Sequence, residues 1–175
     1  MEKRSILSTY DPLFMAVREV YDEAFPLCER RALGDEGRIL GRPDYHLDVW
    51  TDDGAPVGFI GWWDFPGMRY VEHFAVHPAC RQRGYGSRLL SEWISEDSRP
   101  VLLEIEPVTD LTTARREEFY LRLGFVRNDI YHVQPPYHRE TGEVVLCLLS
   151  LPGAITGEDY KSFAAKLRTD IIPPY

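Results

Sequence analysis

The spacing of apolar residues predicts an amphipathic helix near the N-terminus. From Leu13 to Ala24 the apolar residues recur every three or four positions, behind Asp11 as N-cap and Pro12 in the first turn. The charged segment 27–42 is broken by three glycines, which predicts a shorter helix and a loop.

The next part of the chain predicts an antiparallel meander. The runs 45–51 and 56–64 flank the turn residues 52–54, a pattern typical of a hairpin. Residues 68–76 form another apolar run after the turn at 66–67, and we expect a further strand there.

The second half alternates strands with helices. A glycine-rich turn leads into a helical pattern over about 84–96, followed by a strand over 101–105, a helix over about 112–123 and another strand. A helix that crosses between two strands indicates a parallel pair. The last third predicts a strand over 143–149 and a short helix with one apolar face.

These elements predict one fold class. We expect an α/β (α+β) protein with a mixed, mostly antiparallel central sheet, one parallel strand pair, and helices on both faces. No linker, charge block or internal repeat divides the sequence. We therefore expect a single domain over residues 1–175, a length at which one hydrophobic core suffices.

Composition argues against several classes of function. Against 20 Lys and Arg stand 28 Asp and Glu, a net charge of −8 that disfavours nucleic acid as a partner. The three cysteines are widely spaced, which suggests neither a disulfide framework nor a zinc ligand set. No apolar stretch approaches the ~20 residues of a membrane span, and the N-terminus lacks the apolar core of a signal peptide. We expect a cytoplasmic protein that uses neither a membrane nor a metal.

A segment after the third predicted strand has the features of an anion site. The strand stops at His77-Pro78, because proline lacks a backbone donor. Gly84 and Gly86 then precede a helix, so the backbone can turn tightly and the free N–H groups of the helix start can face a ligand. Three arginines add positive charge there: Arg81, Arg83 and Arg88. The alternative is an ordinary strand-to-helix turn with solvated arginines.

The glycine spacing narrows the class of ligand. A Rossmann-type site, which binds NAD, needs a third glycine where this chain has Leu89. A P-loop needs Gly-Lys-Ser/Thr, which is absent. What remains is the pattern R-x-x-G-x-G over residues 81–86.

This pattern resembles the acetyl-coenzyme A signature of the GNAT superfamily of N-acetyltransferases. The similarity extends to Phe74-Ala75-Val76 before the loop and to the strand VLLEIEP at 101–107. It continues to Tyr120 and Gly124-Phe125, which match the family's Tyr-x-x-x-Gly-Phe ending.

The resemblance implies a GNAT-type fold in which the strands 70–76 and 101–105 splay apart to hold coenzyme A. Backbone groups near Phe74 and Val76 are implied to pair with the pantetheine arm, and the N–H groups after Arg81 with the pyrophosphate. Where the family often has Asn, this chain has Thr113, which puts that cofactor contact in doubt. The implied cofactor-binding residues are Phe74, Ala75, Val76, Arg81, Gln82, Arg83, Gly84, Tyr85, Gly86, Ser87 and Thr113.

Acetyl transfer to an amine needs an acid for the departing thiolate, an oxyanion donor and a base. Tyr120 is our candidate acid, since a phenol can return a proton to the thiolate, and an N–H near Phe74 is the candidate oxyanion donor. Glu72 is the first candidate base, because it shares strand parity with Phe74 and Val76. Glu104, in an otherwise apolar strand, is the second. The alternatives are a core aromatic for Tyr120 and a structural carboxylate for Glu72.

We therefore expect an acetyl-CoA-dependent N-acetyltransferase that modifies an amine of a small molecule or protein by direct attack. The turn 134–138 is a candidate wall of the acceptor pocket. An exposed C-terminal strand edge would favour a homodimer. The alternative from another class is a non-catalytic CoA-binding or sensing module. The sequence leaves the identity of the amine open.

Overall fold

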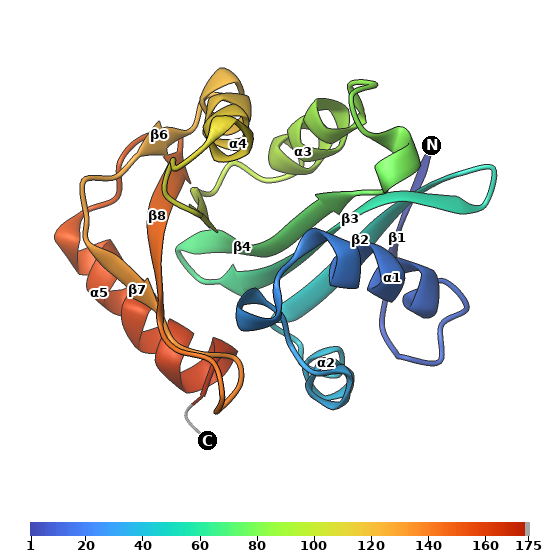
Figure 1. Cartoon of the computed structure of the whole chain (residues 1–175), viewed down its shortest axis with the longest axis horizontal. Helices are drawn as coiled ribbons and strands as arrows, with labels where there is room; N and C mark the ends of the chain where they lie inside the picture. Colours follow the sequence, from blue (N-terminus) through green and yellow to red (C-terminus); the bar gives the residue numbers. More distant parts are fainter. Residues whose placement is uncertain (174–175) are drawn as a thin grey trace. The chain divides into compact units, whose positions relative to one another are not determined.

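The computed structural model describes residues 1–173, which fall into two compact units (Figure 1). The N-terminal unit comprises residues 1–26 and 30–101. The C-terminal unit comprises residues 27–29 and the chain from 102 onward.

The N-terminal unit carries four strands in an antiparallel meander, with helices on both faces of its sheet (Figure 1). Its elements are β1 (Glu2–Ile6), α1 (Phe14–Ala24), α2 (Leu33–Ile39), β2 (Tyr45–Asp52), β3 (Ala55–Phe65), β4 (Met68–Val76), the short helix η2 (Pro78–Cys80) and α3 (Tyr85–Ser95).

The predicted hairpin is confirmed as β2 and β3. Asp53 and Gly54 both adopt left-handed backbone, with φ of 49° and 78°, as a tight two-residue turn between twisted strands requires. The strand that sequence patterning did not predict is β1, which pairs Glu2 with Thr51 and Ile6 with Leu47. Four of its five residues are exposed, so this edge strand has no apolar alternation to detect.

The predicted first helix is confirmed as α1, but its predicted cap is wrong. The helix begins at Phe14, behind Leu13, and no side chain caps it. The Asp11 carboxylate instead accepts a hydrogen bond from the Leu13 N–H at 2.9 Å, so it stabilises the turn before the helix. Of the predicted apolar face, Val17, Val20 and Tyr21 are buried, and Leu13, Ala16 and Ala24 are half-buried. Phe14, which the spacing did not include, is buried as well.

A buried arginine ties α3 to β4. Arg69 is 2% exposed, and its guanidinium donates to the carbonyls of Trp93, Ile94 and Asp97 at 3.0, 3.1 and 2.6 Å. It also lies 4.2 Å from the centroid of the Trp93 ring. A cation near these carbonyls is attracted by the negative end of the helix dipole. The hydrogen bonds and this attraction fix the end of α3 to β4.

The C-terminal unit packs helices against short strands. Its elements are η1 (Leu27–Glu29), β5 (Val101–Ile105, which starts at the unit boundary), α4 (Leu111–Arg122), β6 (Val126–Arg127), β7 (His132–Gln134), β8 (Val144–Leu151), α5 (Gly157–Lys166) and η3 (Leu167–Ile171). Both β6 and β7 pair antiparallel with β8. The predicted strands over 101–105 and 143–149 are confirmed as β5 and β8, whereas the one strand expected after the helix is two short ones.

Both long helices of this unit begin at capping boxes. In α4 the Asp110 side chain accepts from the backbone N–H groups of Thr112 and Thr113, and in α5 the pair is Thr156 and Asp159. In Figure 1, α5 runs beside β7. Within residues 1–173, every helix is too short or too polar to cross a membrane.

We predict that Arg69→Met destabilises the protein by about 3 kcal/mol, because three buried or half-buried carbonyls lose their donor. The free energy of unfolding in urea measures this loss. Arg38 is the matched control, since its side chain is 84% exposed and Arg38→Met should change stability by less than about 0.5 kcal/mol. Equal losses in both variants would show that Arg69 does not anchor α3.

Candidate active site

The loop between β4 and α3 turns through left-handed backbone twice. After β4 ends at Val76, η2 is capped by His77, whose Nδ1 accepts from the Ala79 N–H. Gln82 and Gly84 then have φ of 60° and 79°. This conformation is strained for a residue with a side chain, so glycine is the residue that fits position 84 without strain.

The N-terminus of α3 is uncapped. Gly84 is its N-cap residue and provides no side-chain hydrogen bond, and no acidic residue lies in the first turn. The first N–H groups of a helix have no intrahelical acceptor, and the dipole makes this end positive. Residues 81–84 are exposed, so this end of the helix has the geometry predicted for an anion site.

The arginines of this loop have different surroundings. Arg81 folds back onto the protein, where its Nε donates to the Val76 carbonyl at 3.0 Å and its Nη1 pairs with Glu23 at 3.2 Å. The Arg83 guanidinium lies 5.6 Å from the centroid of the Tyr85 ring. Arg81 therefore braces the loop, and the peptide N–H groups of the helix start, with the exposed Arg83 and Arg88, are left as anion donors.

Glu72 in β4 lies within a buried ion-pair cluster. Its side chain is 0% exposed; Oε1 accepts from the Arg31 guanidinium and Oε2 from the Trp63 indole at 2.8 Å. Along β4, Glu72, Phe74 and Val76 are less buried than His73 and Ala75. The register with β3 shifts between Val71 and His73, so the predicted parity of Glu72 with Phe74 stays a prediction. The exposed part of Glu72 is main chain.

Glu104 in β5 has partners of a different kind. Its side chain is 5% exposed, Oε1 contacts Nε2 of His132, and Oε2 accepts from the Gln134 amide at 2.9 Å. Neither partner carries a permanent charge. The predicted acceptor wall therefore contributes one residue, Gln134, to the surroundings of a candidate base.

Tyr120 lies one helical turn after Arg116 on α4. Burial raises the pKa of Tyr120 to about 12, and the nearby charge of Arg116 acts in the opposite direction. The phenol ring packs edge-on against Phe125, with centroids 5.7 Å apart. At neutral pH the phenol is therefore protonated, as a hydrogen-bond donor must be.

Sequence reasoning missed Glu29 in η1. Burial raises the pKa of the Glu29 carboxyl; Arg116 lowers it and Glu104 raises it further. Arg116 also pairs with Glu106. Tyr120, Arg116, Glu29 and Glu104 thus belong to one electrostatic network within the C-terminal unit. Glu29 lies among charged residues in the sequence, where nothing distinguishes it.

Thr113, the residue at the family's Asn position, has a structural role. Its Oγ1 accepts from the N–H groups of Thr109 and Asp110, both at 3.0 Å, in the capping box of α4. This role accounts for its burial, and the implied cofactor contact stays a prediction.

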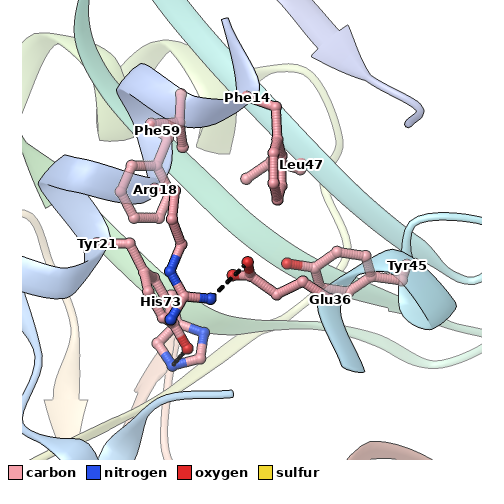
Figure 2. A pocket seen from close by; sticks show the side chains of 9 residues that line it. Phe14, Arg18, Tyr21, Glu36, Tyr45, Leu47, Phe59 and His73 are labelled. Atoms are coloured by element: carbon pink, nitrogen blue, oxygen red, sulfur yellow. Dashed lines mark hydrogen bonds and ion pairs between the residues drawn. The ribbon is translucent and has the colours of Figure 1, made fainter. Parts of the chain in front are cut away.

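A small pocket lies in the N-terminal unit between α1, α2 and the sheet (Figure 2). Figure 2 shows Arg18 directed at Glu36, and the two side chains are joined by a hydrogen bond of 2.8 Å. Tyr21 and His73 lie beside them, with Tyr21 Oη 3.3 Å from His73 Nε2. The enclosed space is about 10 Å³, enough for about one water. The Arg18–Glu36 ion pair forms part of the lining, and the space is too small for a ligand larger than a water.

Comparisons with known proteins decide the family. A presumed acetyltransferase of the GNAT family from Bacteroides thetaiotaomicron has a structure with a TM-score of 0.90, 33% sequence identity, and coverage of 100% of both chains. The chain belongs to the GNAT family of acetyltransferases. The family model described as an acetyltransferase (GNAT) domain matches residues 43–127. A search of curated proteins gives no match.

More distant structures share the GNAT fold. The ribosomal-protein-S18-alanine N-acetyltransferase of Escherichia coli aligns over 90% of this chain and 97% of its own, with a TM-score of 0.63 and 20% identity. An aminoglycoside 6′-N-acetyltransferase complexed with coenzyme A aligns over 86% and 96%, with a TM-score of 0.58 and 17% identity. The predicted fold class and family are confirmed.

Two expectations about this GNAT protein stay predictions. They are the splaying of the strands 70–76 and 101–105 and the role of each site residue. Across residues 1–173, His, Cys, Asp and Glu side chains form no group of three or more suited to a metal ion.

We predict that Gly84→Ala weakens coenzyme A binding at least tenfold, measured by calorimetry. A Cβ at Gly84 meets no atom within 4 Å, so the change acts through backbone conformation, at a cost of about 1–2 kcal/mol. Gly54→Ala is the matched control, with φ of 78° and equally open space in a hairpin turn. It should destabilise the protein similarly and leave the affinity unchanged. Unchanged affinity in Gly84→Ala would contradict the assignment of this loop.

We predict that Tyr120→Phe reduces the alkaline loss of stability. The folded pKa of about 12 exceeds the usual 10.0, so the stability from this phenol is complete below pH 10 and is lost as pH rises through 12. Between pH 8 and pH 11 the variant should lose about 1 kcal/mol less than wild type in urea unfolding. Tyr131→Phe, at a residue that is 78% exposed, should behave as wild type. Identical alkaline slopes for Tyr120→Phe and wild type would contradict the burial of the phenol.

Proposed function

We propose that this GNAT protein transfers the acetyl group of acetyl-CoA to an amine by direct attack of the amine on the thioester. The observation that carries the proposal is the uncapped N-terminus of α3 behind the pattern R-x-x-G-x-G. Its N–H groups bind the pyrophosphate, a role supported by the geometry of helix N-termini toward phosphates. A structural neighbour complexed with coenzyme A adds support.

The backbone of β4 receives the rest of the cofactor. Main-chain groups at Phe74 and Val76 pair with the pantetheine arm, and an N–H near Phe74 stabilises the oxyanion. The partial exposure of Glu72, Phe74 and Val76 supports this role. Since the Glu72 side chain is 0% exposed, it is the main chain of that residue that is accessible.

Tyr120 protonates the departing sulfur. Its buried phenol is fully protonated at neutral pH, and Arg116 limits the rise of its pKa. General acid catalysis of this kind contributes about 10²–10⁴-fold to a rate.

Glu104 is the better candidate for the base, ahead of Glu72. A carboxylate bound to a guanidinium is stabilised in its charged form and is a poor proton acceptor. Glu72 has such a partner in Arg31, whereas Glu104 contacts His132 and Gln134. Glu72 therefore supports β4, and Glu104 deprotonates the amine.

The acceptor is an amine, and the net charge of −8 favours one that carries positive charge. We keep the expectation of a cytoplasmic enzyme that acts without nucleic acid or membrane. A homodimer stays a prediction.

The test is release of coenzyme A thiol from acetyl-CoA with a panel of amines: amino acids, peptides with free N-termini or lysines, polyamines and aminoglycosides. Cys28, Cys80 and Cys147 are free thiols, so each rate is corrected for a reaction without amine. We expect Tyr120→Phe to lower kcat at least a hundredfold with coenzyme A affinity unchanged.

Tyr131→Phe is the matched control for that substitution and should keep the wild-type rate, because the Tyr131 side chain is 78% exposed. Equal rates for Tyr120→Phe and wild type would remove Tyr120 from the mechanism. Binding of coenzyme A without turnover of any amine would favour the non-catalytic module.

A further inference from the structure

Three elements of the C-terminal unit bring polar side chains together in its interior. Glu104 comes from β5, His132 and Gln134 from β7, and Tyr160 from α5. The side chains of Glu104 and His132 are 5% and 1% exposed. Burying a carboxylate and an imidazole is unfavourable unless they are paired, so this cluster needs a reason beyond packing.

The hydrogen bonds of the cluster fix the orientation of the imidazole. An ionised carboxylate only accepts hydrogen bonds, so Nε2 of His132 carries a proton and donates to Oε1 of Glu104. The other ring nitrogen, Nδ1, lies 3.3 Å from the Tyr160 hydroxyl. The ring therefore stands between the carboxylate and a phenol.

The Tyr160 hydroxyl can hydrogen-bond to His132 whether the imidazole is neutral or protonated. When His132 is neutral, the Tyr160 hydroxyl donates to Nδ1. When His132 is an imidazolium, Nδ1–H donates to the Tyr160 oxygen, and the hydroxyl donates to the Tyr131 carbonyl at 3.4 Å. Phe163 packs on the ring with centroids 5.8 Å apart. The imidazole is therefore held between the Glu104 carboxylate, the Tyr160 hydroxyl and the Phe163 ring.

Gln134 fixes the second oxygen of Glu104. Its Nε2 donates to Oε2, and its Oε1 is buried without a partner in the described part of the chain. Rotating the amide would place two acceptors against each other. An unsatisfied buried oxygen is unfavourable. The amide is nevertheless oriented so that its N–H donates to the carboxylate, which favours one orientation of Glu104.

We propose that His132 is a positioning residue that holds Glu104 in the orientation and charge state needed to accept the proton of the acceptor amine. The inference rests on the proposed function. The charged and titratable groups around His132 and its carboxylate include Tyr160 from α5 and Glu29 from η1. Arg116 from α4 acts on Glu29 in the same network. At metal sites, loss of a residue that orients a ligating histidine or carboxylate typically lowers activity 10–100-fold, and we expect a loss of the same order here.

The chemical step balances as follows. The acceptor ammonium gives one proton to Glu104, and its nitrogen forms a bond to the acetyl carbon. The carbon–sulfur bond of the thioester breaks, and the departing sulfur takes the phenol proton of Tyr120. The nitrogen then loses its second proton, which restores the Tyr120 phenol. The products are the amide and the free thiol of coenzyme A, and Glu104 releases its proton to solvent.

The experiment compares His132→Leu with His132→Gln in the complete protein, with one amine from the panel that wild type acetylates. Glutamine can place an N–H where Nε2 lies, so His132→Gln should keep kcat within about threefold of wild type. We expect His132→Leu to lower kcat 10–100-fold with coenzyme A affinity unchanged. The acid limb of its kcat against pH should move to higher pH, because the buried carboxyl keeps Gln134 but loses its His132 donor and therefore ionises less readily.

His46→Leu is the matched control, a histidine of the N-terminal unit that stacks on Trp62. It should leave both kcat and the pH profile unchanged. A merely structural role of His132 would lower folding stability without moving the pH profile, and that outcome would overturn the proposal.

Introducing His132→Leu into Glu104→Gln provides the decisive comparison. If His132 acts through Glu104, the second substitution changes kcat less than twofold in that background. A 10–100-fold loss in both backgrounds would overturn the proposal.

A readout independent of turnover is the ring N–H signal of His132 in NMR spectra. We expect a protected Nε2–H resonance in wild type that is lost or strongly shifted in Glu104→Gln. If wild type acetylates no amine, the proposed function fails and the catalytic role of His132 fails with it. A preserved, Glu104-dependent signal in that case still shows that the pair is coupled, whereas its absence overturns the contact itself.

Discussion

Arg69 donates hydrogen bonds to carbonyls at and just after the C-terminal end of α3. These bonds fix the position of the helix and therefore of the N–H groups at its other end. A buried guanidinium satisfies three carbonyls and fixes the helix to β4. The opposite end begins at Gly84, with no side-chain cap and no acidic residue in the first turn. A helix held by a cation at one end and left open at the other directs unsatisfied N–H groups outward from a fixed position. The proposed cofactor site depends on this asymmetry.

The two candidate bases show how partners distinguish chemically identical residues. Glu72 and Glu104 both lie on strands, and both side chains are almost fully buried. Arg31 provides one with a permanent cation, and His132 and Gln134 provide the other with groups that can be neutral. The first arrangement favours a fixed charge that stabilises the fold, and the second leaves a carboxylate that can exchange a proton.

Much of the fold was predictable because its elements carry strong local signals. The helix α1, the hairpin of β2 and β3, and the turn before α3 follow from apolar spacing and from residues such as Gly54 and Gly84. The strand β1 was missed because an edge strand with exposed side chains has no alternation. The loop motif was also evident, since closely spaced glycines between a strand and a helix are typical of phosphate-binding turns.

The surroundings of the candidate catalytic groups were not predictable in the same way. Nothing in the sequence indicates that His132 contacts Glu104, because the two residues are 28 positions apart and meet only in the folded chain. Glu29 is equally inconspicuous, although burial alters its proton affinity. Sequence motifs identify residue types, whereas burial and hydrogen-bond partners decide which of several carboxylates is suited to chemistry.

The loop before α3 has a consequence for how ionic strength acts on the protein. Arg81 is engaged with Val76 and Glu23, so the peptide N–H groups at the start of α3 are close-range donors there, beside the exposed Arg83 and Arg88. The attraction of these N–H groups is short-ranged, whereas the net charge of −8 repels a polyphosphate from afar. Added salt weakens the long-range repulsion by the net negative charge more than it weakens the close hydrogen bonds to the peptide N–H groups. Capture of such a ligand should therefore become faster in a saline buffer, the reverse of what a basic binding surface shows.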